Sequence, residues 1–209
     1  MRHHYDRVIL ALVVSASLSL TACQNRGPQS DSGQEKHAAA QKPEDQPVNP
    51  DAKALAGFLD RVNQYVEVHK KLEDALPHLS KESTPQQIDT HQRALGEQIQ
   101  KARRDAKAGD IFTPDAQVAI KRLLGRVFGG PDGPALKSSI MDENPGIPNL
   151  RVNDRYPDSV PLSTIPPQVL QGLPKLPEEM EFRFIGNSLI LMDVHAHIIA
   201  DFIPNAFPR

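Results

Sequence analysis

The chain has 209 residues, with 24 Lys and Arg against 26 Asp and Glu, so its formal charge at neutral pH is −2. A nearly balanced charge gives no electrostatic reason to expect a nucleic-acid partner. Trp is absent and aromatic residues make up 5% of the chain, which argues against stacking platforms for carbohydrate. Cys23 is the single cysteine, so the chain cannot form an internal disulfide.

Residues 1–22 have the layout of a secretory signal peptide. Two arginines precede an apolar run over residues 8–20, which is shorter than a membrane-spanning helix requires. The run ends in Leu-Thr-Ala-Cys at Cys23, and this sequence resembles the lipobox of bacterial lipoproteins. The resemblance implies cleavage before Cys23 and acylation of its thiol, so the membrane is an expected partner. Gln24 is not the Asp that retains lipoproteins at the inner membrane, which favours an outer-membrane location facing the periplasm.

Composition divides the mature chain into a tether and one globular domain. Residues 23–50 are rich in Gln, Pro, Asp and Glu and are predicted to form a disordered tether. Residues 51–209 are numerous enough for a single hydrophobic core. We expect this domain to be helical over residues 51–144, to continue as a Pro-rich strap over 145–177, and to end in a β-meander over 178–209.

Apolar residues recur every three or four positions in the first part of the domain, as they do on helices with one buried face. The first predicted helix covers residues 51–76. The second begins with a capping box at residues 84–87 and extends to Gly109. The third is capped by Thr113, and a short fourth helix covers residues 134–143. The pattern predicts an N-terminal bundle of three to four helices.

Two histidines lie on the predicted inward faces of the first two helices. A short loop joins these helices, so we expect an antiparallel hairpin that sets His69 opposite His91 or Gln92. Such a facing pair could be a metal site or a pH-sensitive contact. The alternative is that both imidazoles lie at the edge of the helix–helix contact, hydrogen-bonded to backbone or water.

The end of the chain has the pattern of a β-meander, which makes the predicted fold class α+β. Phe182 and Phe184 alternate with charged residues, as on a half-buried strand. Gly186 and Asn187 suit a two-residue hairpin turn. Residues 189–192 are apolar on both faces, as in a central strand, and residues 198–203 supply a third strand. A sheet of this size must bury a face, and we expect the helices to cover it while the strap runs over the helices.

The connection over residues 193–197 reads Asp-Val-His-Ala-His and resembles the opening metal motif of the amidohydrolase superfamily. That family carries His-x-His at the end of its first barrel strand, whereas only 12 residues follow His197, so we do not expect its barrel. A smaller metal site formed by Asp193, His195 and His197 together with Asp201 is a hypothesis. The alternative is a polar hairpin connection in water.

A wider resemblance covers about residues 55–207, which are similar to a family of uncharacterised exported bacterial proteins. The segments that carry it are residues 109–114, 142–145, 150–153, 161–167, 182–193 and 201–206. The resemblance implies export, and it supplies no catalytic residue.

Three functional hypotheses follow. The sequence contains no nucleophile elbow, P-loop or dinucleotide fingerprint, so it predicts no catalytic residue and no cofactor. We therefore expect a lipid-anchored envelope protein with a non-catalytic binding or structural role and an envelope protein as partner. The first alternative is a periplasmic metal-binding or metal-dependent protein that uses residues 193–197. The second is a hydrolase of envelope material whose site is assembled from distant residues.

Overall fold

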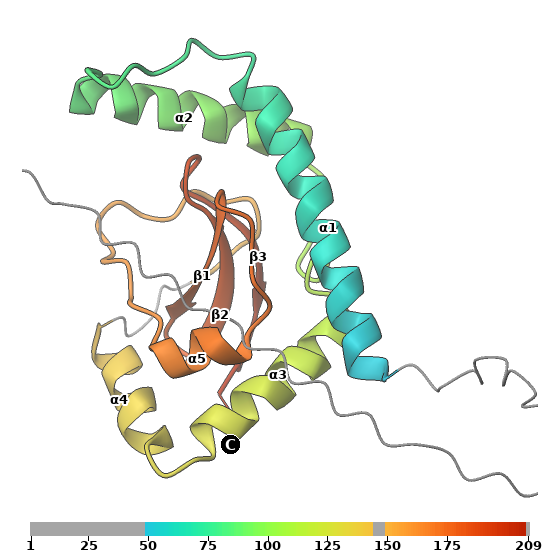
Figure 1. The fold of residues 1–209 in the computed structure, drawn as a ribbon. Helices are drawn as coiled ribbons and strands as arrows, with labels where there is room; N and C mark the ends of the chain where they lie inside the picture. The colour runs from blue at the N-terminus through green and yellow to red at the C-terminus, as the bar shows by residue number, and fades with distance from the viewer. Residues whose placement is uncertain (1–48, 144–148, 208–209) are drawn as a thin grey trace, which may run out of the picture. The chain divides into compact units, whose positions relative to one another are not determined.

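The computed structural model describes residues 49–143 and 149–207, where helices are followed by a small sheet (Figure 1). The elements are α1 (Pro50–Glu73), α2 (Pro85–Ala102), α3 (Pro114–Phe128), α4 (Gly133–Glu143), α5 (Pro167–Gly172), β1 (Met180–Ile185), β2 (Ser188–Asp193) and β3 (Ile198–Ile203). The α+β prediction is confirmed. The predicted signal peptide, Cys23 and residues 23–48 of the predicted tether lie outside the described residues.

The helices begin where their capping residues predict. The hydroxyl of Thr84 accepts the Gln87 N–H at 3.3 Å, and the Gln87 side chain accepts the Thr84 N–H at 2.8 Å. This reciprocal pair confirms the predicted capping box. The hydroxyl of Thr113 caps α3 in the same way, at 3.4 Å from the backbone N–H three positions on. Helix α2 ends at Ala102, seven residues before the predicted end at Gly109.

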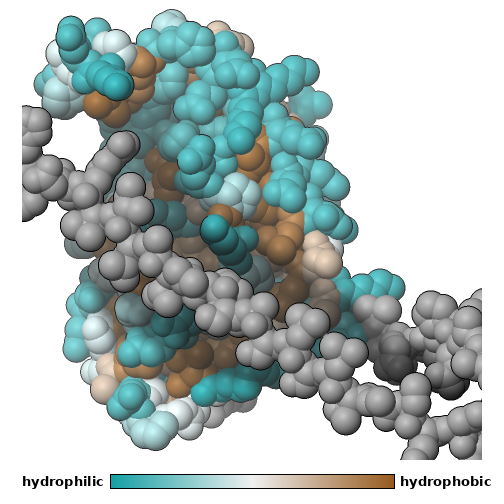
Figure 2. Space-filling view, in the orientation of Figure 1, coloured by the Kyte–Doolittle hydropathy of each residue, from teal (hydrophilic) through white to brown (hydrophobic). Residues whose placement is uncertain are grey.

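Helix α1 contacts both α2 and α3, and α3 in turn contacts α4 and α5. The first two helices cross at a steep angle in Figure 1 and do not lie side by side as the predicted antiparallel hairpin. They meet where Glu73 lies near His91 and where Tyr65 lies under the guanidinium of Arg103. Their outward surface in Figure 2 is mostly hydrophilic, as the amphipathic pattern predicts. Within the described parts of the chain, none of the helices combines the length and apolar composition needed to cross a membrane.

The three strands form an antiparallel sheet in the order β1-β2-β3, as predicted. Gly186, with a φ of 52°, begins the turn between β1 and β2. A register shift between Leu191 and Met192 interrupts the pairing of β2 with β3. Strand β2 lies in the centre, and its residues from Leu189 to Asp193 are all buried. This burial confirms the prediction of a central strand covered on both faces.

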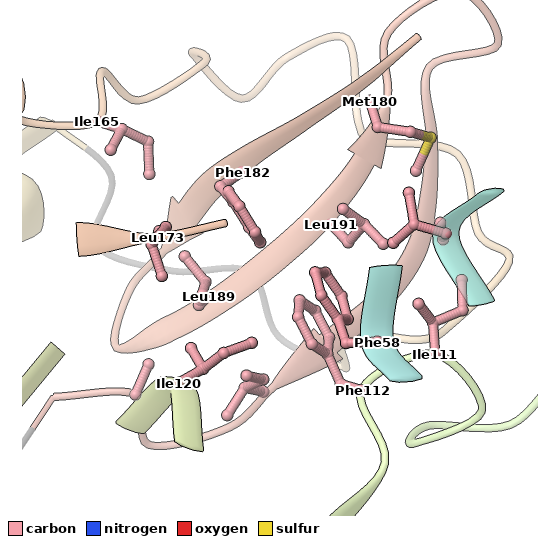
Figure 3. Close-up of a cluster of buried hydrophobic side chains, with 14 of the residues drawn as sticks. Phe58, Ile111, Phe112, Ile120, Ile165, Leu173, Met180, Phe182, Leu189 and Leu191 are labelled. Atoms are coloured by element: carbon pink, nitrogen blue, oxygen red, sulfur yellow. The ribbon is translucent and has the colours of Figure 1, made fainter. Parts of the chain in front are cut away.

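The helices cover one face of the sheet. Phe58 of α1, Phe112 and Phe182 of β1 stack with ring centroids 5.0 to 6.3 Å apart. Figure 3 shows these rings beside Leu189 and Leu191, which extend from the same face of β2. This aromatic stack joins α1 and the α2–α3 connection to the sheet, and burial of each ring contributes on the order of 2 kcal/mol.

The start of the strap covers the other face, whereas its later part, which includes α5, contacts α3, as expected of a strap that runs over the helices. Ile190 and Met192 pack there against Tyr156 of the strap. The strap also pairs with β3, because Asn153 donates its N–H to Ile199 O and Tyr156 donates to His197 O, both at 2.8 Å. The reason is that β2 is apolar on both faces, while β3 would otherwise expose an unpaired edge.

A buried carboxylate ties the α2–α3 connection to the sheet. Asp201 of β3 is fully buried and accepts the backbone N–H groups of Gly109 at 3.0 Å and of Ile111 and Phe112 at 2.8 Å. Gly109 has a φ of 94°, a conformation that glycine adopts without strain. The carboxylate of Asp201 is therefore occupied by backbone donors.

We predict that Asp201→Asn destabilises the fold by about 2–4 kcal/mol, because an amide group would face backbone donors that have no other acceptor. Urea unfolding should show a lower midpoint at an unchanged slope. Asp105→Asn, at a side chain that is 89% exposed, is the control. A loss within about 0.5 kcal/mol for Asp201→Asn, as at ordinary surface positions, would contradict the structural role.

Candidate metal centre

One face of α1 carries three polar side chains at successive four-residue intervals. Tyr65, His69 and Glu73 share this face because side chains four residues apart lie one above the other on a helix. Tyr65 and His69 are buried, whereas the Glu73 side chain is 31% exposed. The face packs where β2 ends and the turn to β3 begins.

Asp193, the last residue of β2, meets this face with its carboxylate fully buried. Its Oδ2 accepts the hydroxyl of Tyr65 at 2.8 Å and lies 2.6 Å from His69 Nδ1. Its Oδ1 accepts the backbone N–H of Ala196 at 2.8 Å. Asp193 thus stabilises its own turn and fixes the imidazole of His69 from one side.

Glu73 is surrounded by three imidazoles. Its Oε2 lies 3.1 Å from His69 Nε2, and its Oε1 lies 3.2 Å from His195 Nδ1. His91 Nε2, from α2, is 3.8 Å from the same Oε1. The rings of His69 and His195 are 5.3 Å apart between centroids. Helix α2 comes this close because Gly96 packs on the turn, where a Cβ would lie 3.1 Å from Ala196 O.

The electrostatics of the buried part favour a fixed protonation pattern. Burial acts to lower the pKa of His69, but hydrogen bonds and attraction from Asp193 and Glu73 outweigh it and raise that pKa above its usual range. Burial, followed by repulsion from the Asp193 carboxylate, raises the pKa of the Tyr65 phenol. Tyr65 therefore keeps its proton and remains a hydrogen-bond donor to Asp193.

The same groups have the spacing of metal ligands. One nitrogen from each of His69 and His195 and one oxygen from Glu73 all lie within 4.8 Å of one another. Two ligand atoms on a tetrahedral ion, each about 2.0–2.1 Å from it, are about 3.4 Å apart. The distances from one oxygen of Glu73, Oε2, to His69 Nε2 and to His195 Nδ1 are 3.1 and 3.4 Å, which are close to that value. No second group of this kind occurs in residues 49–143 and 149–207.

The structure separates the four residues predicted to form a metal site around the β2–β3 turn. His195 belongs to the cluster, and Asp193 contacts it through His69. His197 lies elsewhere, with its ring 5.6 Å from Tyr156, and burial lowers its pKa. Asp201 binds the α2–α3 connection instead. The two histidines diverge because residues 194–197 form a turn, with a φ of 57° at His197, rather than a continuing strand.

The predicted pair His69 and His91 does meet, through Glu73 rather than directly. Glu73 and Tyr65 were not among the residues predicted to form the cluster. Their signal was available, since both lie four residues from His69 on the face predicted to be buried. The contact with Asp193 had no such signal, because it joins positions 124 residues apart.

Comparison of the chain with protein-family models, with curated proteins and with solved structures returns no match. The resemblance to exported bacterial proteins therefore stays a prediction.

A further buried carboxylate lies beside the cluster. Glu179 is 3% exposed and receives the ammonium of Lys70 at 2.8 Å. Burial acts to raise the pKa of Glu179, but the hydrogen bond from Lys70, its own backbone and the attraction of Lys70 together lower it. Glu179 is therefore ionised in the folded protein. It holds Lys70, which follows His69 in α1, against the start of β1.

We predict that this ionisation makes stability depend on pH. A lowered pKa means that Glu179 stabilises the fold above its unfolded pKa of about 4.3, and that this contribution is lost as the pH falls through the folded value. Urea unfolding in EDTA between pH 7 and pH 3 should therefore show a steeper loss of stability in the wild type than in Glu179→Gln. Glu178→Gln, at the exposed neighbour, controls for the lost charge. Equal slopes in the wild type and Glu179→Gln would contradict this prediction.

Proposed function

We propose that this chain is a metal-binding protein that holds one divalent transition-metal ion through His69, Glu73 and His195. The observation that carries the proposal is that these three donors, from α1 and from the β2–β3 turn, converge within 4.8 Å. Two imidazoles and one carboxylate suit zinc and its neighbours in the transition series, whereas calcium and magnesium prefer oxygen ligands. This is the metal-binding alternative raised by the sequence, with a different ligand set.

The surroundings favour a site that ions can reach. The side chains of His195 and Glu73 are 43% and 31% exposed, while His69 is buried behind them. Three protein ligands leave a fourth position for water or an exogenous ligand. His91, whose side chain is 12% exposed, is the nearest further nitrogen to Glu73. The site therefore suits reversible binding of an ion or of a small ligand on that ion.

We predict that the full-length chain, purified in detergent without a polyhistidine tag, binds one equivalent of Co²⁺, a probe whose d–d absorption reports its ligands. Loss of an outer-shell partner costs about 10–100-fold in affinity, so His195→Ala, which removes a ligand, should cost at least about 100-fold. His197→Asn is the matched control, because it changes the other histidine of the same turn and Asn accepts the positive φ.

Two outcomes of this titration would contradict the proposal. One is the absence of equimolar binding in the wild type. The other is binding that His195→Ala and Glu73→Gln both leave unchanged, which would assign the ion to histidines elsewhere, such as His37.

We further propose that the protein acts at the bacterial envelope, anchored through lipidated Cys23 to the periplasmic face of the outer membrane. The proposal is supported by the apolar run over residues 8–20 and the Leu-Thr-Ala-Cys sequence that follows it. A lipid anchor and a metal site are compatible, since an envelope protein can bind metal as its non-catalytic role. The envelope protein partner expected from the sequence stays a prediction.

Cells grown with labelled palmitate should incorporate the label into the wild-type chain and not into Cys23→Ser. The reason is that the acyl groups attach to the thiol of Cys23 and to the amino group that cleavage before Cys23 sets free. The measurement is autoradiography of the immunoprecipitated chain. Label in both chains, or in neither, would contradict the anchor and would leave the metal proposal unaffected.

A further inference from the structure

We propose that Asp193 is a positioning residue for the metal: it holds the proton of His69 on Nδ1 and so directs the Nε2 lone pair to the ion. The inference rests on the proposed metal site and assigns a task to a buried carboxylate that is not itself a ligand. It also gives a role to Tyr65, whose hydroxyl binds the same carboxylate oxygen.

The geometry divides the two nitrogens of His69 between two environments. Nδ1 lies 2.6 Å from Asp193 Oδ2, in a place where both side chains are fully buried. Nε2 faces Glu73, the group shared with His195, on the side that opens to solvent. An ion that enters past His195 therefore meets Nε2 alone. An imidazole binds a metal through one nitrogen and usually donates its other N–H to a carboxylate or carbonyl, and Asp193 is that acceptor.

The carboxylate of Asp193 is itself held from two further directions. Tyr65 donates to Oδ2 at 2.8 Å, and the Ala196 N–H donates to Oδ1 at 2.8 Å. The second bond also shapes the turn that carries His195. Asp193 thus orients His69 through a side-chain contact and fixes the turn that carries His195. Neither task requires the carboxylate to touch the ion.

Asp193→Asn tests the orientation with little change in shape. An amide cannot accept at both positions: if its oxygen faces Ala196, its NH₂ group faces His69 Nδ1. The imidazole would then favour the tautomer with its proton on Nε2, which must be removed before an ion binds. A histidine held in the wrong tautomer by this exchange is a known source of large functional losses.

Asp193→Asn should bind Co²⁺ with 10–100-fold weaker affinity, about the cost of losing an outer-shell partner, and should show an altered d–d spectrum. Its near-ultraviolet circular dichroism without metal should match that of the wild type. Glu179→Gln is the matched control, because it alters a second buried carboxylate beside α1 that does not touch His69. It should leave the cobalt spectrum unchanged. A folded Asp193→Asn with wild-type affinity and spectrum would overturn the positioning role.

A measurement on the wild type decides the question if Asp193→Asn does not fold. Long-range ¹H–¹⁵N spectra of the zinc-loaded protein, with His69 assigned by its loss in His69→Gln, should show a protonated Nδ1 and a metal-bound Nε2. Metal on Nδ1, or no metal on His69, would overturn the inference. If the wild type binds neither Co²⁺ nor Zn²⁺, the proposed function is wrong and the positioning role falls with it, whereas binding with the opposite tautomer rejects the positioning role alone.

Discussion

The carboxylate of Asp193 is the constraint on which the arrangement around β2 depends. This carboxylate has no exposed surface, and it lies at the end of a strand that is apolar on both faces. A buried charge without partners costs several kcal/mol, so the fold must supply donors there. It supplies the phenol of Tyr65, the imidazole of His69 and the Ala196 N–H. These contacts set the rotation of α1 about its axis, and that rotation brings Glu73 to the turn that carries His195.

Directional polar contacts complement the apolar packing between the helices and the sheet. Stacking of Phe58, Phe112 and Phe182 stabilises their contact but tolerates small shifts, since the hydrophobic effect has no direction. Asp193 and Asp201 add fixed geometry, one through side chains of α1 and the other through backbone N–H groups of the α2–α3 connection. Ligand atoms must lie within a few tenths of an ångström of their places to bind an ion well. Two buried carboxylates on adjacent elements help to provide that precision.

Local chemistry explains what could be predicted from the sequence. Thr84 with Gln87 satisfies the free backbone donors of a helix start, and the apolar residues of β2 require cover on both faces, whatever lies elsewhere in the chain. The site depends on distant contacts. Residues 193–197 were predicted to be a connection between strands, but nothing local indicated that its turn would send His195 and His197 to different places. The contacts of α1 with the end of β2 could not be predicted, because no local pattern pairs residues so far apart in sequence.

The most direct test of the central claim is an anomalous difference map from crystals of the full-length chain grown with one equivalent of zinc. The geometry predicts a single strong peak about 2.0–2.2 Å from His69 Nε2, Glu73 and His195 Nδ1, with Asp193 on His69 Nδ1. A map without a peak there, with Glu73 still hydrogen-bonded to the two imidazoles, would contradict the claim. It would leave the cluster as a partly exposed group of hydrogen-bonded side chains that only joins α1 to the sheet.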